Sequence, residues 1–148
     1  MKRTDKYPDT KTFHNYNANP KNRITGDCRI RAICTACEIP YNQVVMDLAR
    51  IQCETGYDQC TNQGLDILLK QYGWVKHKQP RKSDNTKYTG EEWCRLLQKD
   101  PWVVIGGRRV VANIGGHHMV AIVDGKVWDT WDSTDGCIGN YWTKAIKE

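Results

Sequence analysis

Hydrophobic residues recur at helical spacing through the first half of the chain. A stripe that begins at Ile30 and continues through Cys37 predicts a helix over residues 27–38, which ends before Pro40. The same periodicity and the usual start and stop residues predict further helices over residues 40–54, 64–72 and 89–97. At the last of these, Thr89 and Glu92 have the spacing of a capping box.

Strand patterns dominate the second half of the chain. The clearest is a hairpin of residues 118–123 and 126–132, joined by the turn pair Asp124-Gly125. Other strands are expected at residues 74–76, 102–105 (a buried strand), 110–112 (an edge strand) and within 136–146. Helices followed by strands indicate an α+β fold with a twisted antiparallel sheet.

Composition indicates one globular domain preceded by a polar arm. The chain has 148 residues, of which 39% are hydrophobic and 26% charged. Residues 1–20 are polar and basic and predict an irregular, partly extended N-terminal arm that Phe13 and Tyr16 can dock on the body, and the domain is expected to span residues 21–148. No apolar run is long enough to cross a bilayer and no secretory signal core is visible. We therefore expect a cytoplasmic protein without a membrane partner, whose seven cysteines are free thiols.

The net charge of +5 is concentrated near residues 2–23 and 76–82. A charge of this size can attract nucleic acid or an acidic partner. No recognition helix or stacking-sheet motif accompanies it, so it fits a solvated face and nucleic acid is not expected as a partner.

Cys28 falls in the first turn of the first predicted helix. Gly26 permits a tight entry into this helix, and Thr25 or Asp27 can cap it. The positive end of a helix dipole favours the thiolate form of a cysteine, which is the nucleophilic form. The alternative is that Cys28 is a small buried hydrophobe, as many free cysteines are.

The predicted hairpin supplies a histidine–carboxylate pair. If Asp124-Gly125 is a two-residue turn, His118 lies opposite Trp131. An ideal ladder then places Asp129 diagonal to His118 on the same face, whereas Asp132 points to the other face unless the strand ends or bulges. A cysteine nucleophile needs a base of this kind and a third group that orients the base.

Two stretches of the sequence together resemble a papain-like cysteine peptidase. The first is Asn19-Pro20-Lys21-Asn22…Gly26-Asp27-Cys28, and the second is His118-Met119-Val120-Ala121 followed by Asp129-Thr130-Trp131-Asp132-Ser133. The pattern is most similar to small papain-like proteins of phages and bacteria, and it spans about residues 17–142. The resemblance implies a helical half that carries Cys28, packed on a sheet that carries His118. For a phage protein it implies the host cytoplasm.

The resemblance also implies roles for individual residues. Cys28 is the nucleophile, His118 is the base and Asp132 is the orienting acid, with Asp129 as the alternative. Asn22 stands where papain-like enzymes keep an amide that helps to form the oxyanion hole. The implied activity is cleavage of a peptide, isopeptide or amide bond in a protein or peptide substrate, without a metal or other cofactor. The sequence departs from the papain signature at Asp27, which places negative charge beside the thiolate.

Two other functions compete with this interpretation. Cys34 and Cys37, with Cys53 and Cys60, supply four thiols for a structural zinc site, although only one close-spaced pair is present. The other alternative is a catalytically silent papain-like fold that serves as a protein-interaction module, since a fold alone does not deliver activity.

Overall fold

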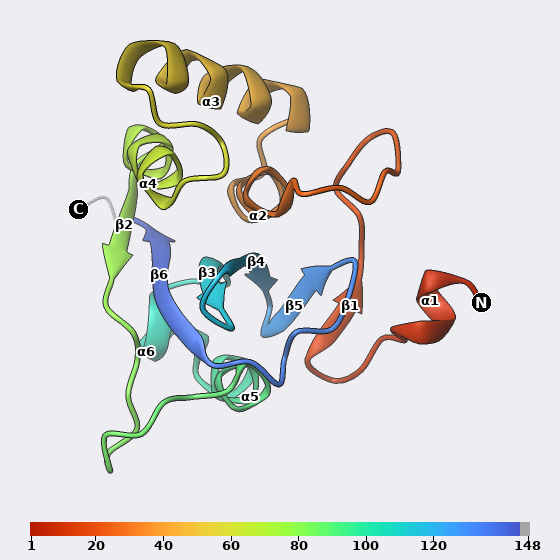
Figure 1. Ribbon diagram of the computed structural model, residues 1–148. Coiled ribbons are helices and arrows are strands. Elements are labelled where there is room, and N and C mark those ends of the chain that lie inside the picture. The colour runs from red at the N-terminus through yellow and green to blue at the C-terminus, as the bar shows by residue number, and fades with distance from the viewer. Residues whose placement is uncertain (146–148) are drawn as a thin grey trace.

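The structure is a computed structural model that describes residues 1–145 and shows an α+β fold around a six-stranded sheet. The strands lie in the order β1-β5-β4-β3-β6-β2 (Figure 1). Their bounds are β1 Phe13–Asn15, β2 Trp74–His77, β3 Arg109–Ile114, β4 His118–Val123, β5 Lys126–Asp129 and β6 Ile138–Lys144. The helices are α1 Arg3–Lys6, α2 Cys28–Cys37, α3 Tyr41–Thr55, α4 Asn62–Gln71, α5 Gly90–Lys99 and α6 Pro101–Ile105.

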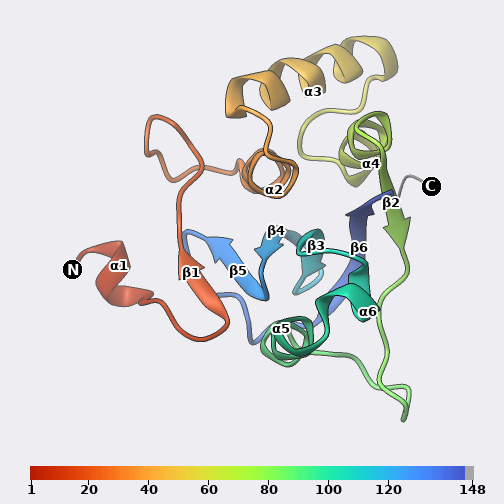
Figure 2. The same cartoon turned by 180° about the vertical axis from the view of Figure 1, so that it is seen from behind.

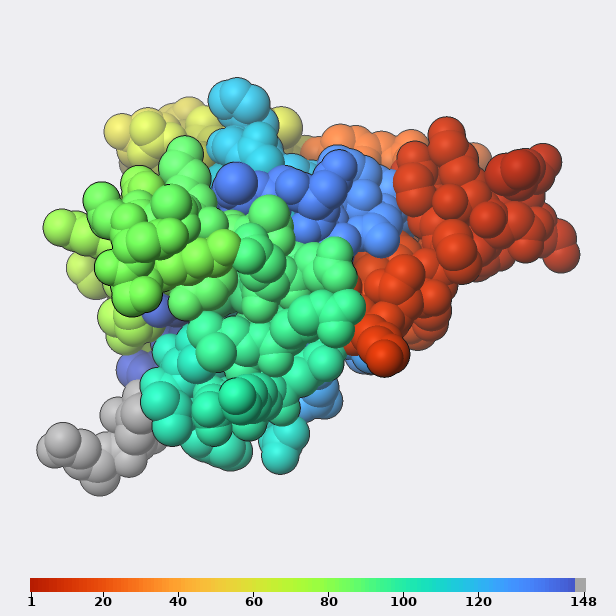
Figure 3. Space-filling view, turned by 90° about the horizontal axis from the view of Figure 1, so that it is seen from below, coloured from red at the N-terminus to blue at the C-terminus, as the bar shows by residue number. Residues whose placement is uncertain are grey.

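Helices cover both faces of the sheet (Figures 1 and 2). Helices α2 and α4 pack on one face, and α3 lies outside them. Helix α5 packs on the other face, with the short α6 beside it. Figure 3 looks onto this second side of the molecule and shows the N-terminal residues gathered at one edge.

Strand β4 is buried from both sides and lies near the middle of the sheet. Its residues Met119 and Ala121 join the core under α2, α3 and α4. Val120 and Ile122 join the second core under α5. Burial on both faces explains why this strand is almost continuously apolar. Because α2 crosses over β4, the first residues of the two elements can meet.

The hairpin has the predicted register, but its second strand ends at Asp129 and not at residue 132. Val123 pairs with Lys126, and the ladder continues to Ala121 and Trp128. Asp124 and Gly125 both have positive φ angles, 51° and 73°, as a tight two-residue hairpin turn requires. The four predicted helices of the sequence are also confirmed, to within two residues at each end.

The sheet is mixed rather than antiparallel, because the N-terminal arm contributes a parallel strand. Strand β1 pairs in parallel with β5, with Phe13 beside Val127. Phe13 is fully buried in the second core. The arm over residues 1–20 is thus partly extended and docked through Phe13, as expected, but the sequence pattern does not predict its pairing as a strand of the sheet.

Two of the strand predictions also need correction. Residues 102–105 lie in helix α6, where Pro101 occupies the first turn, a favourable place for proline in a helix. Trp102 and Val103 are 64% and 85% exposed, so this apolar run is not a buried strand. Strand β3 lies between β4 and β6 rather than at an edge. Among residues 1–145, no helix combines the length and the apolar character needed to cross a membrane.

Candidate active site

Cys28 is the first residue of α2, and its sulfur lies at the end of the helix where backbone N–H groups are unpaired. The first helical hydrogen bond runs from the Arg31 N–H to the Asp27 carbonyl. The backbone N–H groups of Cys28, Arg29 and Ile30 therefore have no partner within the helix. The side chain of Asp27 does not cap the helix, so the positive end of the dipole stays open toward the sulfur.

His118, the first residue of β4, lies beside Cys28, and hydrogen bonding between the two side chains lowers the pKa of the thiol. Hydrogen bonding from the backbone of the next residue, Met119, lowers the same pKa. Burial raises the pKa of the Cys28 thiol, but these two hydrogen bonds and the charges of His118 and Arg29 outweigh it and hold the pKa below its ordinary value. The structure thus brings together the predicted nucleophile and base.

The other side of the His118 ring is held by Asp129. Nε2 of His118 lies 2.5 Å from Oδ2 of Asp129, whose side chain is only 1% exposed. With Nε2 engaged there, Nδ1 remains for the sulfur. Burial lowers the pKa of His118, but its hydrogen bonds to Asp129 and Cys28 outweigh this and raise the pKa to about 9. Trp131 covers the ring, with centroids 4.9 Å apart.

The acid that orients His118 is Asp129, not Asp132. Oδ1 of Asp132 accepts hydrogen bonds from the backbone N–H and the hydroxyl of Thr134, at 2.9 and 2.6 Å. The same carboxylate lines a hollow with Lys6 and Tyr7 of the N-terminal arm. Asp129 lies diagonal to His118 when the register of the ladder is extended, and β5 ends at Asp129, so the strand does not continue to Asp132.

Asn22 has no visible connection with the thiol. It adopts a left-handed backbone conformation with φ of 54°. Its side-chain oxygen accepts a hydrogen bond from Asn17 at 3.3 Å. Among residues 1–145, no hydrogen bond joins Asn22 to Cys28 or His118, so its role in an oxyanion hole remains a prediction without a supporting contact.

Arg31 forms ion pairs with two acids near the candidate site: Asp27, which precedes Cys28, and Asp129, which contacts His118. Its Nε lies 2.8 Å from Oδ1 of Asp27, and its Nη1 lies 2.5 Å from Oδ1 of Asp129. All three side chains are less than 10% exposed. The Asp27–Arg31 pair is visible in the sequence as an i, i+4 spacing on a helix. The link to Asp129, 98 residues away, has no such local signal.

The negative charge of Asp27 is neutralised by its neighbours. Besides Arg31, the hydroxyl of Tyr41 donates to Oδ2 of Asp27 at 2.6 Å and the amide of Asn19 donates at 3.0 Å. Burial raises the pKa of Asp27, but these hydrogen bonds outweigh it and hold the pKa below its ordinary value. The departure from the papain signature is therefore compensated by a buried ion pair.

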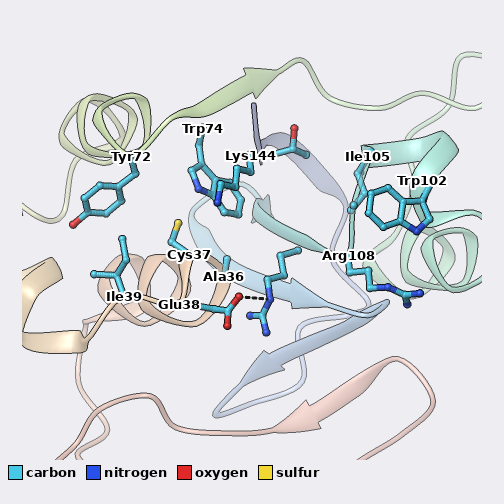
Figure 4. Close-up of a pocket in the computed structure, with 14 residues that line it drawn as sticks. Ala36, Cys37, Glu38, Ile39, Tyr72, Trp74, Trp102, Ile105, Arg108 and Lys144 are labelled. Atoms are coloured by element: carbon cyan, nitrogen blue, oxygen red, sulfur yellow. Dashed lines mark ion pairs between the residues drawn. The ribbon is translucent and has the colours of Figure 1, made fainter. Parts of the chain in front are cut away.

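The far end of α2 carries a larger cavity but no base. This cavity, of about 450 Å³, is bordered by Cys37, Trp74 and Trp102 among others (Figure 4). The one acid among the residues drawn there, Glu38, pairs with Arg109 at 3.1 Å. Burial raises the pKa of the Cys37 thiol to about 12. Cavity size alone therefore does not locate the thiol chemistry in this protein.

The cysteines do not form the zinc site considered above. All seven are free thiols, and Cys53 and Cys60 are exposed while Cys34 and Cys37 are partly buried on α2. In the part of the chain that the structure describes, no three His, Cys, Asp or Glu side chains are grouped as metal ligands.

Comparison with models of protein families, with curated proteins and with solved structures found no match to this chain. Any functional conclusion therefore depends on the geometry of the site.

Proposed function

We propose that this protein is a papain-like cysteine hydrolase that cleaves a peptide, isopeptide or amide bond. The observation that carries the proposal is the position of His118 between two partners. His118 lies close enough to Cys28 to lower the pKa of its thiol, and Nε2 of the same ring lies 2.5 Å from the buried carboxylate of Asp129. Nucleophile, base and orienting acid in this order form the arrangement that activates a cysteine.

The reaction follows from this geometry. His118 takes the proton of Cys28, and the thiolate attacks the carbonyl carbon of the substrate. The unpaired backbone N–H of Cys28 donates to the oxygen that becomes negative. His118 then protonates the leaving amine as the carbon–nitrogen bond breaks, which leaves an acyl group on the sulfur. Water, deprotonated by His118, attacks this thioester, and the acid product and the free thiol are released.

The arrangement of elements supports a papain-like assignment. The cysteine starts a helix that packs across the sheet, and the histidine starts a central strand next to the strand that supplies the acid. This matches the resemblance seen at both ends of the sequence, with one change, because Asp129 and not Asp132 is the partner of His118.

Alkylation by iodoacetamide tests the proposal directly. At pH 7 an ordinary thiol is only a few per cent thiolate, so we expect Cys28 to react about tenfold or more faster than the exposed thiols of Cys53 and Cys60. Mass spectrometry of the labelled peptides measures the rates. Digestion of a mixed peptide library, with Cys28→Ala as the control, then tests for hydrolysis.

A catalytically silent interaction module is the alternative, and the exposed Trp102 and Val103 on α6 favour it. It predicts that Cys28 reacts no faster than the exposed thiols and that the library remains uncut. That pair of results would overturn the proposed hydrolase.

A further inference from the structure

A groove of about 290 Å³ opens beside the candidate catalytic pair. Met119, the residue after His118, forms part of its wall, and so does Gly116, two residues before His118. Asn62 lies in the same wall and accepts hydrogen bonds from Arg29, the neighbour of Cys28. A peptide whose carbonyl group reaches Cys28 therefore lies within reach of this groove.

The groove is lined largely by side-chain amides. We call it the amide groove after four of its residues, Asn62, Gln79, Asn113 and Asn140. The oxygens of Asn62 and Asn140 accept hydrogen bonds from Arg29 and from the Gln79 backbone. The nitrogens of Gln79 and Asn113 donate to backbone carbonyls.

One half of each amide therefore remains for a ligand. Two N–H₂ donors, on Asn62 and Asn140, and two carbonyl acceptors, on Gln79 and Asn113, have no protein partner within residues 1–145. A peptide backbone offers the matching set of acceptors and donors.

Lys76 supplies a positive charge to the amide groove. Its ammonium lies 5.7 Å from the ring centroid of Trp142, another residue of the groove. Within the described residues Lys76 has no ion pair, and no carboxylate lines the groove. The nearby Asp66 accepts a hydrogen bond from the Trp142 indole at 2.8 Å. The groove thus combines peptide-like hydrogen-bonding groups with a lysine that has no ion pair within the described residues.

We propose that the amide groove binds the peptide next to the cleaved bond and that Lys76 selects an acidic side chain there. This inference rests on the proposed function for its position beside a catalytic thiol. The binding contacts do not depend on the catalytic thiol. The side-chain amides hydrogen-bond to the peptide backbone. The Lys76 ammonium, which lies against the Trp142 ring, pairs with an aspartate or glutamate carboxylate of the peptide. The substrate class is then an acidic peptide or protein segment.

Peptide binding by the Cys28→Ala protein tests this without requiring turnover. The probes are matched arrays of acetylated hexapeptides in which Glu, Gln or Lys is placed at each position. We expect the Glu peptides to bind about fivefold more tightly than the Gln peptides at one or two positions, which is the upper range for an exposed ion pair. The preference should weaken as the salt concentration rises.

Variants of Lys76 assign the preference to the groove. Lys76→Met should abolish it while keeping the apolar contact with Trp142, and Lys76→Glu should turn it toward Lys peptides. Lys78→Met, an exposed lysine two residues further along the chain, is the matched control and should keep the preference. Binding that does not distinguish Glu from Gln, or a preference that survives Lys76→Met, would overturn the inference.

The same experiment separates this inference from the proposed function. If acidic peptides bind through Lys76 but the parent protein cuts none of them, the hydrolase fails and the binding groove stands. If the parent protein cuts peptides with no acidic preference at any position, the hydrolase stands and the selective role of Lys76 fails.

Discussion

The two ends of helix α2 carry cysteines with opposite properties. Cys28 begins the helix, and its pKa is lowered by hydrogen bonds from His118 and Met119, which outweigh burial. Cys37 ends the helix, and burial raises its pKa to about 12. The N-terminal end of a helix favours a negative charge and the C-terminal end opposes it. The comparison teaches that the pKa of each thiol follows its burial and its hydrogen-bonding partners, not the size of the neighbouring cavity, which is larger at Cys37.

The largest expected effect comes from removing the Cys28 thiol, whereas removing the Cys37 thiol at the other end of α2 should have little effect. Cys28→Ala should lower hydrolysis by about 10³-fold or more, since the whole covalent route is lost. Cys37→Ala, the matched control at the other end of α2, should leave hydrolysis within about twofold because its thiol has no base. Peptide turnover measures both variants. Equal activity of Cys28→Ala and the parent protein would show that the Cys28 thiol is not the nucleophile.

His118→Ala should have the next largest effect. Without the imidazole, Cys28 loses both a hydrogen bond and a positive partner, so its pKa should rise. We expect hydrolysis to fall by about 10²–10⁴-fold, the usual contribution of a general base. The rate of iodoacetamide labelling at pH 7 should fall to that of the exposed thiols. His117→Ala is the control, and a similar loss in both variants would argue against a specific role for His118.

Asp129→Asn and Asp132→Asn distinguish the two candidate acids. Asparagine keeps the shape of Asp129 but cannot stabilise the imidazolium, so we expect hydrolysis to fall by about 10²-fold or more. Asp132 binds Thr134 rather than the histidine, so its variant should retain activity within a few fold. The opposite order of the two effects would restore Asp132 as the orienting acid.

The choice between these acids also shows how far the sequence could lead. The hairpin register came from the Asp124-Gly125 turn alone and correctly placed Asp129 on the diagonal of His118. The resemblance to papain-like enzymes favoured Asp132, because an Asp-Ser pair follows the second strand there. Local ladder geometry was the better guide, since a two-residue turn fixes which side chains share a face.

Other parts of the structure depend on contacts that the sequence does not encode locally. Strand β1 pairs with β5, more than a hundred residues away, and three residues of strand carry no periodicity that reveals a parallel partner. Residues 102–105 form an apolar run that is too short to separate a strand from a helical turn. The contact between Arg31 and Asp129 likewise joins two elements that only the packing of α2 on the sheet brings together.

Arg31→Met should destabilise the protein at the reactive end of α2. The substitution leaves the buried carboxylates of Asp27 and Asp129 without their shared partner. Removing one member of a buried ion pair costs about 3–5 kcal/mol of unfolding free energy, which urea denaturation measures. Arg29→Met, which loses only hydrogen bonds to Asn62, should cost about 1 kcal/mol or less. Similar losses in both variants would mean that Arg31 contributes no more than an ordinary surface arginine.

The smallest effect is a shift of pH dependence that separates the two roles of His118. Hydrolysis needs the protonated ring to supply a proton to the leaving amine, so it should decline as the pH rises through about 9, the pKa of His118. Alkylation of Cys28 needs only the thiolate, whose pKa lies below its ordinary value, and should not decline there. The Asp129 carboxylate raises the pKa of His118, so in Asp129→Asn the alkaline limit of the residual hydrolysis should move to lower pH. An unchanged limit in this variant, or a parallel decline of alkylation and hydrolysis, would show that His118 does not act as the acid of the reaction.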